Sequence, residues 1–582
     1  MAAGRPGLRI ARRPSRLTWL EAGGLQVKRC RRVGSLVDMQ IALAQFDPIV
    51  GDISGNVARM KEMIASAAVG GAQLVVFGEL SVVGYPPRDL LRKEKFVADN
   101  VAAVESLAAA CTDVAALVGF VRATPGESGR PLQNAAALLA DGRIQQVHVK
   151  TLLPTYDVFD ETRYFQPGGK CECMEIDGVR IALSICEDLW DTVALGRELY
   201  GDDPIERLMK AGAQVIVNMA ASPFEMGKAA LREELFARQA ARSGATILYV
   251  NQVGGNDELV FDGGSCAVSP AGKVIARAAS FREDVLLVDL AAEQGRCEPT
   301  GDEMGRLYEA LKLGLRDYVS KCGFDSVVLG LSGGIDSAVV AVLAADALGP
   351  EHVHALAMPS RYSSGHSLAD ARELASNLGI ALDEIPIEPI HKAFEQVLDR
   401  TLSAEGSELA AENIQARIRG NLVMACSNAC GHLALATGNK SELSTGYCTL
   451  YGDMAGGLAP IGDVLKTTVY RLARHINVAA GTDRIPASTL TKPPSAELKP
   501  GQVDQDKLPP YDLLDAILCR YIEHDLTAEQ IIAEGYDASV VTRVVRMVDL
   551  TEYKRKQAAP VLKVTARAFG TGRRMPIAQR YR

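Results

Sequence analysis

A glycine-rich stretch, Gly330–Ser337 (GLSGGIDS), carries residue types suited to phosphate chemistry. Apolar residues 327–329 precede it and helically spaced apolar residues follow from Ala338, so the stretch joins a strand to a helix start. Free backbone N–H groups and the helix dipole bind phosphate oxygens at such a turn. The stretch lacks the lysine of a P-loop and carries Asp336 instead, an acid that suits bound phosphates if it holds Mg²⁺. The alternative interpretation is a plain turn with a serine cap.

A second polar stretch, residues 436–442 (ATGNKSE), also follows a short apolar run. Its last residue, Glu442, is placed to complete a Mg²⁺ site with Asp336, and a loop glutamate without a metal role is the alternative. Residues 446–453 (GYCTLYGD) mix aromatic and polar side chains as a nucleotide pocket does, whereas an ordinary loop is the competing interpretation.

Together with ENIQARIRG, PPSAEL and YKRKQ, these stretches closely resemble the NAD synthetases over 303–582, and the glycine-rich stretch resembles the pyrophosphate-binding loop of the ATP pyrophosphatases. The latter cleave ATP between its α and β phosphates and adenylate a substrate. The resemblance implies ATP as co-substrate and Mg²⁺ at Asp336 and Glu442. It implies ATP contacts from Gly330, Leu331, Ser332, Gly333, Gly334, Ile335, Asp336, Ser337, Thr437, Lys466 and Ser495, with Arg361 as a further candidate. It implies contacts to deamidated NAD from Asn413, Glu442, Tyr447, Cys448, Thr449, Leu450 and Lys554. Taken alone, Lys466 and Lys554 are interpreted as solvated charges.

Three polar residues in the first half of the chain stand at the ends of apolar runs. Glu79 follows LVVFG, Lys150 follows VHV and Cys186 follows IALSI. The strand ends of α/β folds are where side chains converge on a site. A lysine stabilises a neighbouring thiolate, and a glutamate within reach takes and returns the proton, as nucleophilic catalysis requires. Each residue taken singly is interpreted as structural.

In their contexts, FGELSVVGYPPRD, KTLLPTYDVFDE and CEDLW, these three residues resemble the Glu-Lys-Cys triad of the nitrilase superfamily over nearly all of 39–290. The resemblance implies that Cys186 attacks an amide or nitrile carbon to form a thioester, with Glu79 as general base and Lys150 stabilising the oxyanion. YPPRD and NMAASPF are similar to the glutaminase branch. That similarity implies glutamine contacts from Tyr156, Ser222 and Lys228, and an assisting role for Glu161. The family often carries Arg at the position of Lys228, and a lysine lacks its bidentate grip.

Two further groups of polar residues, in different parts of the chain, are interpreted as structural. Glu187 and Asp188, next to the cysteine, are expected to cap the following turn, with a catalytic role as the alternative. Cys426, Cys430 and His432 faintly suggest metal ligands, but no second ligand pair follows and the segment has a helical, apolar pattern.

Joined in one chain, the two resemblances imply glutamine-dependent conversion of deamido-NAD (nicotinic acid adenine dinucleotide) to NAD, through an adenylated intermediate with release of AMP, pyrophosphate and glutamate. Because ammonia must travel neutral and protected, we expect an internal tunnel and a homo-oligomer that helps enclose it. The runner-up is amidation of a different acid, as in the GMP synthetases, which pair their ATP loop with another type of glutaminase. A non-catalytic nucleotide sensor is the alternative from a different class, and the intact triad and Asp336 argue against it.

An α/β scaffold is needed to position these residues. We expect a nitrilase-like α-β-β-α sandwich over 39–290, a linker at 291–302, and a doubly wound, mostly parallel sheet over 303–582, adenine nucleotide α-hydrolase-like, with ligands beyond its strand ends. Expected strands are 39–45, 74–77, 114–121, 134–140, 144–149, 181–185, 215–218, 245–250, 327–329, 352–358, 381–387 and 433–437. Expected helices are 56–68, 99–111, 303–322, 368–378 and 412–429. Residues 489–510 contain five prolines and predict an irregular segment, which we interpret as a mobile flap over the adenylate.

Composition excludes several other classes. The 582 residues are 48% hydrophobic with a net charge of −8, which predicts large cores and no broad basic surface for nucleic acid. No apolar run reaches the ~18 residues of a membrane span. Twelve scattered cysteines indicate a reduced, cytoplasmic setting. The Arg-rich segment 1–38 suggests a transit peptide or an over-long start before Met39. We favour the second and expect disorder there. The Arg-rich tail, 569–582, receives no role.

Overall fold

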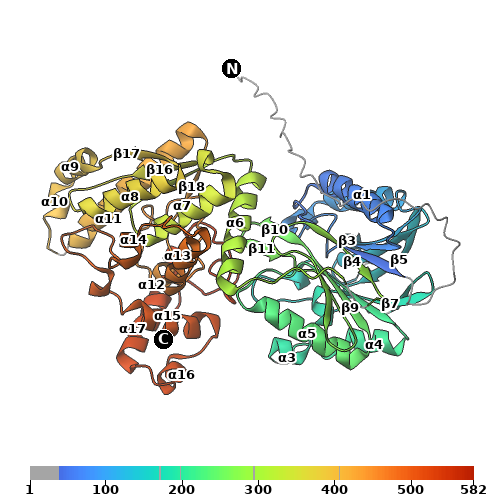
Figure 1. The fold of residues 1–582 in the computed structure, drawn as a ribbon. Helices are drawn as coiled ribbons and strands as arrows, with labels where there is room; N and C mark the ends of the chain where they lie inside the picture. Colours follow the sequence, from blue (N-terminus) through green and yellow to red (C-terminus); the bar gives the residue numbers. More distant parts are fainter. Residues whose placement is uncertain are drawn as a thin grey trace.

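The computed structural model describes residues 39–126, 128–169, 172–196, 198–292, 295–405 and 407–581. The expectations for the basic segment 1–38 therefore fall outside the described residues. Figure 1 shows two α/β halves with helix α6 (Glu303–Lys321) standing between them. Within the described part of the chain, no helix combines the length and the apolar content needed to cross a membrane.

Two six-stranded sheets form the first half. In spatial order, the first sheet contains β14 (Asp284–Asp289), β1 (Gln40–Gln45), β2 (Leu74–Val76), β3 (Ala115–Ala123), β4 (Leu132–Ala140) and β5 (Arg143–Val149). The second contains β13 (Val274–Arg277), β12 (Cys266–Val268), β9 (Thr246–Asn251), β8 (Val215–Ala220), β7 (Val179–Ile185) and β6 (Met174–Ile176). The central strands β1–β2–β3 and β7–β8–β9 are parallel and the outer pairs are antiparallel.

The two sheets pack face to face, with helices on their outer faces. Leu43 and Leu117 of the first sheet share one buried cluster with Leu183 and Val217 of the second. The outer face of the first sheet is covered by α1 (Ile53–Val69) and α2 (Glu94–Ala108), and that of the second by α3 (Thr192–Leu195), α4 (Pro204–Lys210) and α5 (Lys228–Ser243). This is the α-β-β-α sandwich that the sequence predicts.

A four-stranded parallel sheet organises the second half. Its spatial order is β17 (Ala381–Glu384), β16 (Val353–Ala357), β15 (Val327–Gly330) and β18 (Leu433–Leu435). Val327 and Leu329 of β15 enter one buried cluster with α6 and α7 (Ile335–Leu348), whereas Val328 enters another with α11 (Glu408–Cys430). Helices therefore cover both faces, as predicted for a doubly wound fold. The chain order reverses beside β15, which creates the crevice where such folds bind ligands.

The remaining helices of this half lie around the sheet or in a separate apolar cluster beside it (Figure 1). They are α8 (Gly365–Leu378), α9 (Glu388–Val397), α10 (Asp399–Leu402), α12 (Lys440–Thr445), α13 (Lys466–Ala480), α14 (Ala487–Thr491), α15 (Tyr511–Leu518), α16 (Ala528–Ala533), α17 (Ala538–Leu550) and α18 (Glu552–Arg555). Helices α15, α16 and α17 belong to the separate cluster. Most expected elements are confirmed within a few residues. The strand expected at 381–387 is three residues too long, because Pro386 has no N–H to donate to a ladder. The described residues of the expected linker, 291–292 and 295–302, contain no helix and no strand.

Helix α6 fastens the two halves together. It contacts the hairpin formed by β10 (Val253–Asn256) and β11 (Leu259–Asp262) of the first half. Asp317 on α6 accepts a hydrogen bond from Gly255 N at 2.7 Å, and Lys321 Nζ donates to Asp47 Oδ1 at 2.6 Å. Val260 of the hairpin lies in the same buried apolar cluster as α6, so one core crosses the boundary.

Candidate active sites

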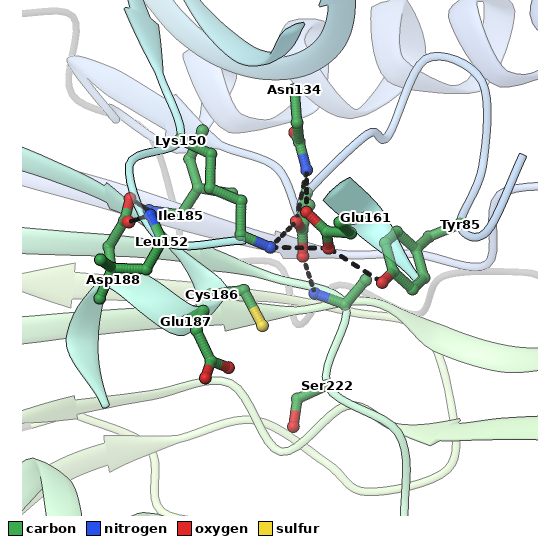
Figure 2. A network of polar contacts seen from close by, with 12 residues as sticks. Tyr85, Asn134, Lys150, Leu152, Glu161, Ile185, Cys186, Glu187, Asp188 and Ser222 are labelled. Atoms are coloured by element: carbon green, nitrogen blue, oxygen red, sulfur yellow. Dashed lines mark hydrogen bonds and ion pairs between the residues drawn. The ribbon is translucent and has the colours of Figure 1, made fainter. Parts of the chain in front are cut away.

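The residues predicted as a triad meet between the two sheets of the first half. Glu79 lies just after β2, Lys150 directly after β5, and Cys186 directly after β7. Lys150 Nζ is 2.7 Å from Glu79 Oε1 and 2.8 Å from Glu161 Oε1. Figure 2 shows the Cys186 side chain beside the Lys150 ammonium and the Glu161 carboxylate. The three strand ends and the FDE segment therefore converge on one site, as the sequence predicts.

This site is almost completely closed to water. Lys150 is 0% exposed, Glu79 1% and Glu161 4%. Burial by itself lowers the pKa of Lys150, but Glu161 and Glu79 together raise it well above its ordinary value, so the ammonium is retained. Burial raises the pKa of Glu161 to about 7, with Lys150 opposing and Glu79 adding to the rise. The arrangement is a buried cation shared by two carboxyl groups.

Cys186 stands at a strained turn. Its φ is +45°, in the left-handed region, where strand β7 enters the short 3-10 helix η4 (Cys186–Leu189). Asn218 Nδ2 donates to Cys186 O at 3.2 Å and to Ser184 Oγ at 3.0 Å, which holds the turn against β8. The turn projects the sulfur from the end of its strand into the space between the sheets.

Lys150 favours the Cys186 thiolate, as expected, but other groups around the sulfur outweigh it. Burial and the charge of Glu79 raise the pKa of the Cys186 thiol well above its ordinary value, while Lys150 only opposes the rise. Glu187 and Glu161 raise it further. The resting sulfur is therefore a thiol, and a base must remove its proton when it attacks.

Two partners of the triad escaped the sequence interpretation. Asn134 Nδ2 donates to Glu79 Oε1 at 2.7 Å, and Tyr85 OH donates to Glu161 Oε1 at 3.0 Å. Ala221 N donates to the second oxygen of Glu79 at 3.2 Å. These bonds fix both carboxylates against Lys150. Asn134 lies inside strand β4, and Tyr85 is the tyrosine of the quoted YPPRD segment, so only the latter carried a sequence signal.

The two acids after Cys186 have different surroundings. Asp188 accepts from Thr151 N at 3.0 Å and Leu152 N at 2.7 Å with one oxygen, and from Ile185 N at 3.0 Å with the other. It therefore ties the Lys150 segment to the cysteine turn, in agreement with the scaffold interpretation. Glu187 instead accepts from two tyrosine hydroxyls beside the cysteine.

The predicted glutamine contacts lie around Cys186. Tyr156 OH donates to Glu187 Oε2 at 2.9 Å, and Tyr200 OH donates to Glu187 Oε1 at 3.0 Å. Ser222 is buried and its backbone is tied to Asn251, and Lys228, the first residue of α5, has its Nζ 5.8 Å from the centre of the Trp190 ring. Burial lowers the pKa of Lys228, while Glu225 opposes this.

The second site lies at the crevice beside β15. The stretch Gly330–Ser337 leaves β15 and enters α7, as predicted. Gly333 has φ +77°, and a Cβ there would lie 2.1 Å from Ser367 O, so no other residue fits this turn. The tight turn brings backbone N–H groups to the N-terminus of α7, where phosphate oxygens are bound favourably.

Two carboxylates predicted as Mg²⁺ ligands face each other across Lys466. Lys466 Nζ bonds both Asp336 and Glu442, the latter at 3.2 Å. Asn439 Nδ2 donates to Asp336 Oδ1 at 2.9 Å. Burial raises the pKa of Glu442 to about 8, with Lys466 opposing the rise and Asp336 and Asp504 adding to it. Such crowding of negative charge favours a cation at this position.

These two carboxylates fit a divalent cation that is shared with a substrate. Mg²⁺ in nucleotide sites takes one or two carboxylates, with the remaining oxygens from phosphates and water. Over the described ranges, no group of three or more His, Cys, Asp or Glu side chains is arranged to hold a metal ion without such help. This includes the Cys426, Cys430 and His432 cluster.

A cavity of about 320 Å³ opens above these residues. Of the residues predicted for ATP, deamido-NAD and metal, those lining it are Gly330, Leu331, Ser332, Gly334, Ile335, Asp336, Ser337, Thr437, Glu442, Tyr447, Cys448, Lys466 and Ser495. Those outside its lining are Gly333, Asn413, Thr449, Leu450 and Lys554. Thr449 Oγ1 donates to Asn413 Oδ1 at 2.7 Å, and Lys554 Nζ donates to Gly446 O and Cys448 O at 2.7 Å. These residues shape the loop at 446–453.

Two arginines near the second site lie differently with respect to the cavity. Arg361 is absent from the cavity lining and instead pairs with Glu388 and Glu395 at 2.7 and 2.9 Å. Arg419, from the quoted ENIQARIRG segment, lines the cavity, and burial lowers its pKa to about 10. Asp504 is a second lining residue without a prediction, and it accepts from Tyr511 OH at 2.8 Å.

Comparisons with known proteins cover both halves. The carbon–nitrogen hydrolase family model matches residues 40–296, and the NAD synthase family model matches residues 307–558. A glutamine-dependent NAD(+) synthetase from Synechocystis is 48% identical over 556 residues, which are 93% of this chain and 99% of that protein. One from Thermotoga maritima is 41% identical over 583 residues, covering 94% and 99%.

A solved structure agrees with these matches. It is that of the glutamine-dependent NAD+ synthetase from Acinetobacter baumannii in complex with adenosine diphosphate. It is 39% identical, has a TM-score of 0.74, and covers 93% of this chain and 98% of its own. The Synechocystis and Thermotoga maritima relatives are 48% and 41% identical to this chain over nearly their full length, and both sites are present in one polypeptide. The chain therefore belongs to the glutamine-dependent NAD(+) synthetase family.

Proposed function

We propose that this chain amidates deamido-NAD to NAD with ATP, using ammonia that it releases from glutamine at Cys186. The observation that carries the proposal is the buried convergence of Glu79, Lys150 and Cys186 in the same chain as the phosphate-loop cavity. The first centre suits amide hydrolysis, and the second suits activation of a carboxylate by a nucleoside triphosphate.

The protonation states of Lys150 and Cys186 support a mechanism for glutamine hydrolysis. Glu79 takes the thiol proton as Cys186 attacks the carboxamide carbon, because the thiol pKa is too high for a resting thiolate. The Lys150 ammonium stabilises the oxyanion, and Glu79 returns the proton to the departing ammonia. Water then cleaves the thioester and releases glutamate. Glutamine itself is held by Tyr156, Ser222 and Lys228, with Glu161 supporting Lys150.

The second half must overcome the poor reactivity of a carboxylate. The nicotinic acid carboxylate of deamido-NAD attacks the α-phosphate of ATP, pyrophosphate leaves, and ammonia then displaces AMP. Gly330–Ser337, Thr437, Lys466 and Ser495 are proposed to hold ATP, while Asp336 and Glu442 hold Mg²⁺. The bound ion supplies charge neutralisation at the phosphates.

The dinucleotide is assigned to the loop beside the cavity. We assign its contacts to the residues predicted from the sequence: Asn413, Glu442, Tyr447, Cys448, Thr449, Leu450 and Lys554. Support comes from their grouping around the loop at 446–453. Lys554 donates to two backbone carbonyls of this loop. Replacing Lys554 would therefore disturb the loop as well as the proposed contact to the dinucleotide.

Ammonia must reach the adenylate without being protonated by bulk water. We therefore expect an enclosed path between the two centres and a homo-oligomer that helps to close it, which sedimentation of the purified chain would test. A cytoplasmic setting is supported by the described cysteines, all of which are free thiols.

Cys186→Ala separates the two half-reactions. We expect NAD synthesis from glutamine to fall by at least about 1000-fold, because no nucleophile remains. Synthesis from added ammonium should stay close to that of the unmodified chain, because the second site is untouched. Cys266→Ala, at another buried cysteine, is the matched control and should keep both activities.

Two outcomes would contradict the proposal. If Cys186→Ala kept glutamine-dependent synthesis, the nitrogen would come from another site. If the unmodified chain, given ATP, Mg²⁺ and deamido-NAD, formed no AMP even with ammonium present, the chain would be a nucleotide binder rather than a ligase.

A further inference from the structure

Residues 561–574, which received no role from the sequence, run along the boundary between the two halves, and we call them the C-terminal strap. Lys563 N donates to Glu258 O of the first half at 2.8 Å. Met226 N, also in the first half, donates to Val564 O at 2.9 Å. The strap backbone is therefore paired with the glutaminase half, although it follows the last helix of the synthetase half.

The side chain of Lys563 is buried between acidic partners. It is 2% exposed, and its Nζ donates to Thr565 O at 2.7 Å. The same nitrogen is 3.1 Å from Asp157 Oδ2 and 3.7 Å from Glu225 Oε2. A buried ammonium of this kind is tolerated only because carboxylates and carbonyls surround it, and the carboxylates depend on it in turn.

Both acidic partners belong to segments that carry proposed glutamine contacts. Asp157 directly follows Tyr156, and Glu225 stands three residues before Lys228. Burial lowers the pKa of Lys228, Glu225 opposes this, and the nearby charge of Lys563 lowers it further. One lysine of the strap thus joins two sides of the glutamine pocket.

The strap residues next to Lys563 also contact the synthetase half. Asp463, fully buried, accepts from Val564 N and Thr565 N at 2.8 Å and from Thr565 Oγ1 at 2.9 Å. Lys440 Nζ lies 3.0 Å from Asp463 Oδ1 and donates to Thr565 Oγ1 at 2.6 Å.

Lys440 adjoins residues of the phosphate site in the sequence. It follows Asn439, which donates to Asp336, and it stands two residues before Glu442. Hydrogen bonds and ion pairs therefore run from the segments proposed to hold glutamine through Lys563, Thr565 and Asp463 to Lys440. The peptide backbone then joins Lys440 to Asn439 and Glu442, beside the carboxylates proposed for Mg²⁺.

We propose that Lys563 is a positioning residue that sets the glutamine pocket from the synthetase half, so that the strap couples the two reactions. The proposal rests on the proposed function. Lys563 acts by holding the Asp157 and Glu225 segments together. Without the ammonium, the two partly buried carboxylates repel each other, and the Tyr156 and Lys228 sides of the pocket separate.

Lys563→Met in the full chain tests the proposal. The KM for glutamine should rise at least about tenfold, while kcat changes less, because positioning of the substrate is lost before the chemistry. NAD synthesis from saturating ammonium should stay within about twofold, because the phosphate site keeps Lys440 and Asp463. The amount of glutamate formed per NAD should also rise, because hydrolysis no longer follows the state of the second site.

A matched control and a second variant complete the design. Arg574→Met removes another strap cation, which is about half exposed and 3.7 Å from Asp160. It should leave the KM for glutamine and the glutamate-to-NAD ratio near their original values. Adding Asp157→Asn to Lys563→Met removes one stranded carboxylate and should recover part of the lost glutamine affinity.

Three results would overturn the proposal. The first is an unchanged KM for glutamine in Lys563→Met. The second is an equal loss of glutamine-dependent and ammonium-dependent synthesis, which would indicate a purely structural role. The third is a double variant no better than the single one. A chain without any ammonium-dependent synthesis before mutation would contradict the proposed function rather than the role of Lys563.

Discussion

At the scale of single residues, the protonation of Cys186 decides how the first reaction must run. Burial, Glu79, Glu187 and Glu161 all raise the pKa of the thiol, and Lys150 alone opposes them. Lys150 is therefore better placed to stabilise charge on a substrate than to create a thiolate in the empty site. Proton removal must be synchronous with attack, which gives Glu79 its role.

Alkylation tests this description of the thiol. Because the pKa of Cys186 is raised, its thiolate fraction should grow about tenfold per pH unit between about pH 6 and pH 9. Inactivation by iodoacetamide, followed as loss of glutamine hydrolysis, should accelerate over this range without a plateau. A plateau below about pH 8 would mean a preformed thiolate.

Glu79→Gln provides a control with two opposite effects. It removes a charge that raises the thiol pKa, so alkylation at fixed pH should become faster. Turnover of glutamine should become much slower in the same variant, because the proposed base is gone.

What the sequence reveals at this scale is limited by distance along the chain. Glu79, Lys150 and Cys186 each end an apolar run, and that position made them visible. Asn134 lies inside a buried strand, where an asparagine has no distinctive neighbours. Its bond to Glu79 emerges only when the sheet forms, because β4 and the residues that follow β2 are 55 positions apart in the sequence. The ATP contact suggested for Arg361 stays a prediction, and in the structure Arg361 pairs with two glutamates of α9.

At the scale of elements, periodicity predicted the parallel strands and the antiparallel hairpin β4–β5 well, but it missed β6 and the antiparallel strands β10 to β14. β7, β8 and β9 are continuous apolar runs and were expected almost as found. The hairpin β10–β11 was missed, since Gly254 and Gly255 interrupt its first strand and resemble a loop. These glycines are explained by close approach of other groups: a Cβ on Gly255 would lie 3.1 Å from the α carbon of Gly314.

The segment predicted as a flap is irregular between α14 and residue 504 and lies over the cavity. Ser495 and Glu497 line the cavity. The Glu497 carboxylate accepts from Ser364 Oγ at 2.9 Å and Ser367 Oγ at 2.8 Å, which latches the segment to the start of α8. A latch of this kind suits a cover that excludes water from a reactive adenylate.

Deleting residues 496–506 should uncouple ATP cleavage from product. Water then reaches the adenylate, and we expect the AMP formed per NAD to rise severalfold, measured by quantifying both products. Glu497→Ala should act in the same direction but more weakly. Lys499→Ala, from the same segment and paired only with Glu412 at 3.6 Å, is the control. If the deletion leaves the AMP-to-NAD ratio unchanged, the segment is not a cover.

At the scale of the whole molecule, a glycine on α6 sets how closely the halves approach. A Cβ at Gly314 would lie 2.7 Å from Val260 Cγ2 and 3.0 Å from Leu562 Cδ1. Val260 belongs to the hairpin of the first half and Leu562 to the C-terminal strap. The absence of a side chain at this position therefore brings three separate segments into contact.

Gly314→Ala should weaken this contact. Alanine favours a helix by about 1 kcal/mol, but overpacking a rigid core costs about 1–3 kcal/mol. We expect a lower melting temperature in calorimetry and more glutamate formed per NAD. Gly365→Ala, at the first position of α8 with no atom within 4 Å of the added carbon, is the matched control and should not lower the melting temperature. Equal behaviour of the two variants would show that the α6 contact tolerates expansion.

The apolar cluster that α6 shares with the β10–β11 hairpin also governs how such chains can be recombined. A cut at the connecting loop would leave each fragment with an exposed apolar surface, so the fragments should precipitate when produced separately. A chimera of two homologous chains should be soluble only when α6 and the β10–β11 hairpin both come from the same parent chain. The best crossover point for recombining the two halves therefore lies within a packed element and not in the loop that joins them.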